Sequence, residues 1–225
     1  MSLPSSPSLL PGMSAGEIAL LTRSLQQVRG AYFEFGCGGS TTLATMCPNL
    51  TSITSVDSSP LWIYKVKKAT ASASMPINMI YVDINADNYN WGKPKDRSKV
   101  NNWPLYSRAI QGNTPPLRTP LDAQTSIPTK FSAILVDGRF RVACALHALD
   151  YLDDKGILLV HDYTNRPQYH VIEQFYHKIG GVETLAVFQK GGGGPCSPMS
   201  PLGTSNSIDL KRLNELRHKY ELIFD

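Results

Sequence analysis

Short apolar runs alternate with amphipathic stretches along most of the chain. The apolar runs predict buried strands, and apolar residues that recur every three to four positions predict helices between them. The strands are expected at 32–35, 52–57, 77–84, 131–137, 157–162 and 182–190, and the helices at 15–28, 41–47, 60–71, 142–152, 167–179 and 208–223. This alternation predicts an α/β fold of Rossmann-like type, a doubly wound, mainly parallel sheet with helices on both faces. A strand at 220–224 competes with the last helix.

The same pattern predicts one domain with flanking segments. The expected parts are a flexible lead at 1–13, a domain at 14–190, a linker at 191–207 and a C-terminal helix in 208–225. The domain contains a proline-rich insertion or lid at 85–130, which is too long for an ordinary connection and is where we expect substrate choice to reside. Aromatic residues of the insertion, such as Trp91, either bind a carbohydrate or planar ring or anchor the loop.

Composition adds few constraints on function. The 225 residues are 42% hydrophobic, which suits one domain with a sizeable core. The formal net charge is +4 without a long basic run, so a nucleic-acid partner is permitted but not indicated. The four cysteines lack the spacing of a zinc site, and no signal peptide or long apolar segment is present. We therefore expect a cytoplasmic protein with no membrane partner, and the sequence makes no prediction of oligomeric state.

A glycine-rich turn follows the first predicted strand. Gly36, Gly38 and Gly39 lie within four positions, and glycines without a Cβ let a ligand approach the main chain. A dinucleotide turn requires G-x-G-x-x-G, but Thr41 occupies the third glycine position. Glu34 stands two positions before the first glycine, where a site for S-adenosylmethionine (SAM) requires an acid. The turn therefore favours SAM, although a glycine turn of any α/β protein is an alternative.

The stretch from Glu34 to Ser40 resembles the first motif of class I methyltransferases, E/D-x-G-x-G-x-G, with Ser40 in place of the last glycine. The resemblance implies that the Glu34 carboxylate lies near the amino group of the methionine part of SAM. It also implies that the backbone of the turn passes under the cofactor. The cofactor-binding residues expected here are Glu34, Gly36, Cys37, Gly38, Gly39, Ser40 and Thr41.

Asp57 ends the second predicted strand, 23 residues after Glu34. Rossmann-like folds place an acid that binds ribose hydroxyls at a similar spacing, roughly 20 residues. We assign Asp57 and the adjacent Ser58 to the cofactor site; the alternative is that Asp57 caps the helix beginning near residue 60. The resemblance to methyltransferases further implies that Asp83 and Ile84, at the end of the third strand, border the adenine ring.

Acidic residues end five of the predicted strands. The carboxyl ends of parallel strands meet at one edge of a sheet, so these carboxylates are expected to line one cleft. The five are Glu34, Asp57, Asp83, Asp137 and Asp162. The last two, together with His161, would face the methyl acceptor.

An acceptor hydroxyl needs help to lose its proton. Either His161 or an aspartate acts as general base, or a divalent cation (Mg or Mn) held by Asp137 and Asp162 acidifies the hydroxyl. In the competing interpretation, Asp162 caps the next helix and His161 is an ordinary strand residue. Arg139 is a further catalytic candidate, which would neutralise Asp137, bind an acidic group of the substrate or be exposed; pairing of Arg139 and Arg141 with local carboxylates is slightly favoured.

Longer motifs resemble a narrower group of enzymes. The segments 136–144 and 161–170, together with the Trp91-Gly-x-Pro94 pattern, look like a group of poorly characterised bacterial-type methyltransferases over 14–190. The pattern around His161 is more distantly similar to plant glucuronoxylan O-methyltransferases. The paired acids are similar to those of metal-dependent sugar O-methyltransferases of macrolide tailoring, except that His161 replaces the first of two acids. These resemblances imply a SAM-dependent O-methyltransferase acting on a sugar or glycan hydroxyl.

Other functions stay open. A small-molecule O- or N-methyltransferase fits the same motifs, since the acceptor depends on the insertion. A noncatalytic binding module with this fold would not need the acceptor-side acids, and a nicotinamide oxidoreductase is weakened by Thr41. A nucleobase amino-methyltransferase is disfavoured because the residues from Asp137 to Phe140 lack an [N/D]-P-P-[Y/F] turn.

Overall fold

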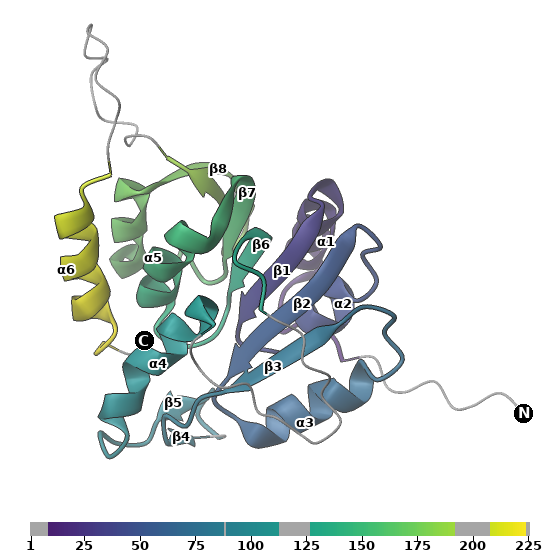
Figure 1. Ribbon diagram of the computed structural model, residues 1–225, viewed down its shortest axis with the longest axis horizontal. Helices are drawn as coiled ribbons and strands as arrows, with labels where there is room; N and C mark the ends of the chain where they lie inside the picture. The colour runs from purple at the N-terminus through teal and green to yellow at the C-terminus, as the bar shows by residue number, and fades with distance from the viewer. Residues whose placement is uncertain (1–8, 88, 113–126, 192–207, 224–225) are drawn as a thin grey trace, which may run out of the picture.

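A seven-stranded sheet forms the centre of the molecule. The computed structural model describes residues 9–87, 89–112, 127–191 and 208–223. The strands lie in the order β3-β2-β1-β6-β7-β9-β8 (Figure 1). They are β1 (Gly30–Phe35), β2 (Leu50–Asp57), β3 (Ile77–Tyr81), β6 (Phe131–Val136), β7 (Leu152–Val160), β8 (Tyr176–Val182) and β9 (Leu185–Lys190). Every pair is parallel except those that β9 makes with β7 and β8. This sheet confirms the predicted Rossmann-like α/β fold.

Helices cover both faces of the sheet (Figure 1). On one face lie α1 (Ala15–Gln27), α2 (Gly39–Ala44) and α3 (Pro60–Ala69), and on the other α4 (Trp103–Arg108), α5 (Arg141–Tyr151) and α6 (Leu210–Tyr220). Side chains alternate along each strand, so one strand serves two cores. In β1, Phe33 belongs to the core under α4, α5 and α6, whereas Tyr32 belongs to the core under α1 and α2.

The predicted insertion is folded against the sheet in its described part. It forms a short hairpin of β4 (Ala86–Asp87) and β5 (Lys93–Pro94), the 3-10 helices η1 (Val100–Asn102) and η2 (Ala109–Gln111), and α4 between them. Trp103 and Tyr106 of α4 are buried in the core under α5, so these aromatic residues anchor the segment. Residues 113–126 of the insertion, 1–8 of the predicted lead and 192–207 of the predicted linker lie outside the described residues.

One predicted helix is wrong in its second half. Residues 167–179 were expected to be helical. The 3-10 helix η3 (Pro167–Gln174) ends at Gln174, and β8 follows it as an edge strand of the sheet. Most of β8 is exposed and contains Gly180 and Gly181, so it lacks the apolar alternation by which a strand is recognised. The last helix is confirmed as α6, which includes Tyr220 in place of the competing strand. Among the described residues, no helix has the length and apolar character needed to cross a membrane.

Candidate active site

The polar residues that follow the parallel strands gather at one edge of the sheet. Phe35 of β1 pairs with Val56 of β2 and with Val136 of β6, and Val136 pairs with Val160 of β7. Because these strands end in register, the residues after them are neighbours. We call this edge the rim; it comprises the turn 36–39, Asp57 with Ser58, Asp137 with Gly138, and His161 with Asp162.

Glycines of the rim permit close approach between segments of the chain. Gly36 has a φ of +94°, and a Cβ at this position would lie 2.8 Å from backbone atoms of Gly138. The turns after β1 and β6 therefore touch through two residues without side chains. Gly39 also permits a close approach, because a Cβ there would lie 2.0–2.3 Å from the backbone of Leu10 and Pro11; its contact with the cofactor stays a prediction. The N-terminal segment thus crosses over Gly39.

Glu34 is buried beneath the turn and is 0% exposed. Four hydroxyl groups donate to its carboxylate, from Tyr32 at 3.0 Å, Ser40 at 2.9 Å, Ser55 at 2.6 Å and Thr41. A carboxylate has about four acceptor positions, and these donors fill them. The structure therefore ties Glu34 to α2 and β2 in place of the predicted methionine amine. The hydroxyls of Ser40 and Thr41 both donate to Glu34, and contact of the cofactor with these two residues stays a prediction.

Burial of Glu34 should make folding stability depend on pH. Desolvation raises its pKa from 4.5 to about 7, although the four hydroxyls oppose that rise. Between those values the folded protein holds a proton that the unfolded chain has released, so stability falls as pH rises. Between pH 5 and pH 7.5 we expect wild type to lose about 2.5 kcal/mol more stability than Glu34→Gln. Urea unfolding of both proteins at pH 5 and 7.5 measures this, and an equal loss in both would contradict it.

Asp57 remains at the rim and contacts the glycine turn. Its Oδ2 accepts a hydrogen bond from the backbone N of Cys37 at 3.1 Å, and its Oδ1 accepts one from the backbone N of Ser59 at 2.8 Å. Desolvation raises its pKa to about 6 against the effect of these bonds. The N-cap of α3 is Ser59, whose hydroxyl accepts from Trp62 N, so the alternative capping role of Asp57 is wrong. Ser58 is buried beside it.

The two residues predicted to border adenine have different surroundings. Asp83 is partly exposed, accepts a hydrogen bond from the backbone N of Asn85 at 3.0 Å and pairs with Lys99 at 3.2 Å. It therefore holds the start of the insertion. Ile84 is 0% exposed and its side chain packs within the core under α4, so it could border adenine only through its backbone, which stays a prediction.

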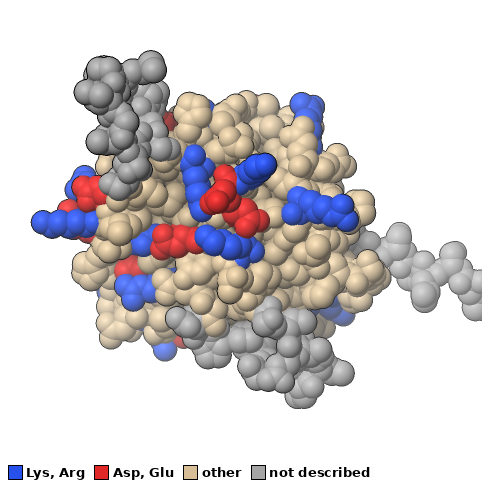
Figure 2. Space-filling view, turned by 45° about the horizontal axis from the view of Figure 1, so that its top comes forward, with Lys and Arg blue, Asp and Glu red and all other residues tan. Residues whose placement is uncertain are grey.

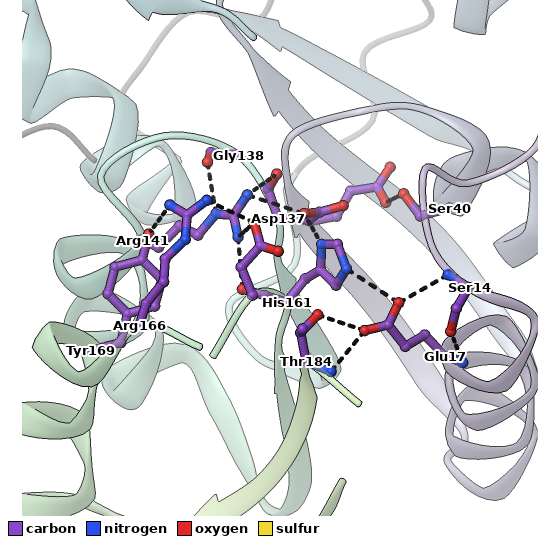
Figure 3. A network of polar contacts seen from close by, with 12 residues as sticks. Ser14, Glu17, Ser40, Asp137, Gly138, Arg141, His161, Arg166, Tyr169 and Thr184 are labelled. Carbon is purple, nitrogen blue, oxygen red and sulfur yellow. Dashed lines mark hydrogen bonds and ion pairs between the residues drawn. The ribbon is translucent and has the colours of Figure 1, made fainter. Parts of the chain in front are cut away.

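A chain of ionisable residues joins the acceptor side of the rim to α1 (Figure 3). Asp137 Oδ1 lies 2.8 Å from His161 Nδ1, and His161 Nε2 lies 3.5 Å from Glu17 Oε2. Burial lowers the pKa of His161, but the hydrogen bond with Asp137 and the nearby negative charges raise it overall. Both ring nitrogens of His161 face carboxylates, and this placement stabilises the cationic form of the ring relative to a free imidazole.

Glu17 is the functional candidate that the sequence pattern missed. It completes the predicted capping box with Ser14 and also accepts hydrogen bonds from the backbone N and the hydroxyl of Thr184, at 2.9 and 2.5 Å. Burial alone would raise its pKa, but the bonds from Thr184 and Ser14 and the charge of His161 lower it to about 2. The sequence indicated the capping role of Glu17 through the spacing of Ser14 and Glu17. It gave no indication of the contact between Glu17 and His161.

Arg141 lies between the two aspartates of the acceptor side and is 4% exposed. Its Nη1 donates to Asp162 Oδ2 at 2.8 Å and to the carbonyl oxygen of His161 at 2.7 Å. Its Nε donates to the carbonyl oxygen of Gly138 at 3.0 Å, and its Nη2 lies 3.3 Å from Asp137 Oδ1. Although burial raises the pKa of Asp162, the charge of Arg141 lowers it overall. The structure therefore agrees with the interpretation that Arg141 pairs with local carboxylates, those of Asp137 and Asp162.

Asp137 and Asp162, the two predicted metal ligands, lie on either side of the Arg141 guanidinium group. Asp137 and Asp162 both contact Arg141, and Asp162 Oδ2 also accepts from Arg166 at 3.0 Å. In the described part of the chain, no group of three or more His, Cys, Asp or Glu residues could hold a metal ion. The donor set therefore does not fit the predicted divalent cation. Arg139 lies beside this network, where its carbonyl oxygen accepts from Cys144 Sγ at 3.2 Å.

Comparison with known proteins agrees with this architecture. No protein-family model matches the sequence, and no curated protein matches it either. Among solved structures, the chain is similar to a methyltransferase-like protein from Silicibacter pomeroyi, at 26% identity over 93% of this chain and 97% of that chain, with a TM-score of 0.69. It is also similar to cofactor-bound Rv0187 from MTB, at 11% identity over 80% and 83% of the two chains, with a TM-score of 0.51. The chain has the class I methyltransferase fold.

Proposed function

We propose that this protein is a SAM-dependent methyltransferase whose cofactor binds at the rim beside Asp57. The observation that carries the proposal is Asp57 itself, an acid at the end of β2 held by the amide of the glycine turn. Its Oδ2 and Oδ1 accept the backbone N–H groups of Cys37 and Ser59, and ribose hydroxyls would donate to the same carboxylate. The 26% identity with a methyltransferase-like protein over almost the whole chain supports the same conclusion.

Asp137 is the group best placed to receive the acceptor's proton. Bound SAM supplies an electrophilic methyl group on a sulfonium, so the protein has to position the acceptor and remove its proton. His161 and Arg141 both contact Oδ1 of Asp137, and the structure gives Oδ2 no partner among the described residues. Asp137 therefore offers one fixed and one available oxygen. His161 lacks such a free nitrogen, and we assign it a positioning role in place of the predicted general base.

The acceptor class rests on the sequence resemblance. We propose a sugar or glycan hydroxyl, with a small-molecule oxygen or nitrogen acceptor as the alternative. On the face shown in Figure 2, Lys and Arg side chains at the centre lie among Asp and Glu, so that region offers a nucleic-acid backbone no continuous basic surface. A screen of glycan acceptors with labelled SAM tests the acceptor class. Turnover that requires Mg²⁺ and is abolished by EDTA would restore the metal prediction.

Binding of S-adenosylhomocysteine (SAH) tests the cofactor assignment. We expect calorimetry to detect SAH but not NAD, and Asp57→Ala to weaken SAH binding about 10- to 100-fold, because hydrogen bonds to a carboxylate contribute about 1.5–3 kcal/mol. Asp154→Ala is the matched control, since this aspartate is almost fully exposed and pairs with Lys190 at 3.5 Å. A wild-type protein that binds NAD and not SAH would exclude the methyltransferase.

A further inference from the structure

The hairpin of β4 and β5 lies against the end of β2. Its base is fixed by Asn85, whose carbonyl oxygen accepts from Lys95 N at 2.9 Å and whose side chain contacts Asp96 at 3.2 Å. Its turn approaches the residue that follows Asp57, because a Cβ at Gly92 would lie 3.8 Å from Ser58 Oγ. The hairpin is therefore held in place beside the proposed ribose site.

This turn presents aromatic side chains to solvent. Trp91 is 87% exposed and Tyr89 is 100% exposed. Trp91 also has a φ of +53°, in the left-handed region that is unfavourable for a bulky residue. Exposing an indole to water and holding a bulky residue at positive φ both cost free energy. Neither feature adds to the packing of the hairpin, because the Trp91 side chain is 87% exposed. Together they indicate a ligand for the indole of Trp91.

A second indole approaches Asp57 from α3. Trp62 is 37% exposed, and its Nε1 donates to the carbonyl oxygen of Cys37, whose backbone N in turn donates to Asp57. A Cβ at Gly38 would lie 3.4 Å from the same Nε1. Trp62 is thus fixed on the glycine turn that contacts Asp57. Trp91 precedes Gly92, the hairpin residue that lies beside Ser58.

We propose that Trp91 stacks on the adenine ring of the bound cofactor, which makes the hairpin a recognition element for the purine. This inference rests on the proposed function. The base is joined directly to the ribose, so a nucleoside held at Asp57 would present its purine to the neighbouring elements, and the hairpin turn beside Ser58 is one of them. Purine faces stack on indole rings, and this contact removes both rings from water. The adenine ring, not the methyl acceptor, is the occupant.

Calorimetry with two probes tests the stacking. Wild type, Trp91→Ala, Trp91→Phe and the control Tyr64→Ala are titrated with SAH and with 5′-methylthioadenosine, which lacks the amino-acid part. We expect Trp91→Ala to weaken both probes by the same factor, about 10- to 100-fold, as for loss of one base–aromatic stack. Trp91→Phe should retain most of the affinity, and Tyr64→Ala, at an exposed position of α3 where the ring contacts Lys68, should retain all of it.

The outcomes separate this inference from the proposed function. If wild type binds SAH and Trp91→Ala binds it equally well, the stacking is wrong and the methyltransferase stands. If Trp91→Ala lowers only turnover with an acceptor, the indole serves the acceptor and the inference is overturned. If wild type binds neither probe, the proposed function fails first. Quenching of tryptophan fluorescence by SAH that is lost in Trp91→Phe would add independent support.

Discussion

Replacing Asp137 with asparagine will lower kcat by about 10²- to 10⁴-fold and leave the affinity for SAH within about threefold. Asparagine keeps the size of the side chain but cannot accept a proton from the methyl acceptor. Because Asp137 lies at the end of β6, separated by β1 from Asp57 of β2, the cofactor contacts should be unaffected. Single-turnover kinetics with labelled SAM and the acceptor found by screening measure kcat, and calorimetry measures SAH binding.

Two further variants distinguish the base from its neighbours. His161→Gln should reduce kcat less than Asp137→Asn and should change its pH profile, because His161 holds Oδ1 of Asp137 without facing the acceptor. Asp154→Asn, at a nearly fully exposed position, is the matched aspartate control and should behave as wild type. Asp137→Asn with kcat within threefold of wild type would remove Asp137 from the chemistry, and His161→Gln with the larger loss would return the base to His161.

Replacing Arg141 with methionine will destabilise the folded protein by about 3 kcal/mol. Methionine retains much of the volume but removes the cation that Asp137 and Asp162 share, together with donors to the carbonyl oxygens of three residues. Asp137 would then keep only His161 and Asp162 only Arg166 as cationic partners, in a half-buried site. Urea unfolding at pH 7.5 measures the loss.

The matched control for Arg141 is Arg166→Met. Arg166 also bonds to Asp162, at 3.0 Å, but its side chain is 31% exposed, against 4% for Arg141. Its removal should therefore cost about 1 kcal/mol or less, because exposed ion pairs contribute little. Arg141→Lys should fall between the two, since it keeps the charge but loses the planar set of donors. Equal losses for Arg141→Met and Arg166→Met would show that burial of the guanidinium does not determine how much each arginine contributes to the free energy of unfolding.

Local patterns identified most of the sheet. Strands β1, β2, β6 and β7 are apolar runs bounded by turn residues, and the register of parallel neighbours brings their ends together as predicted. The capping box of Ser14 and Glu17 also depends on residues three apart, and the structure confirms it. Strand β8 was missed because an exposed edge strand leaves no apolar alternation.

The candidate site was predicted less completely. The sequence placed Glu34 correctly at the end of β1, but it did not show that four hydroxyls from other positions surround the carboxylate. In the same way, Gly39 was recognised as part of a turn, whereas its contact is the backbone of Leu10 and Pro11. Strand periodicity assigns a residue to one of two faces, but only the segments packed on that face determine its partner.

The sequence by itself determined the order of most strands and helices, β8 excepted, the glycine turn and the acids at the strand ends, because each depends on residues close together in the chain. Only the tertiary structure decided that Arg141 joins Asp137 to Asp162 and that Glu17 meets His161. These contacts bring together ends of β6, β7, α5 and α1, whose separation in space depends on the packing of the whole sheet. The strength of an ion pair depends on that distance and on burial, and neither is encoded in local spacing.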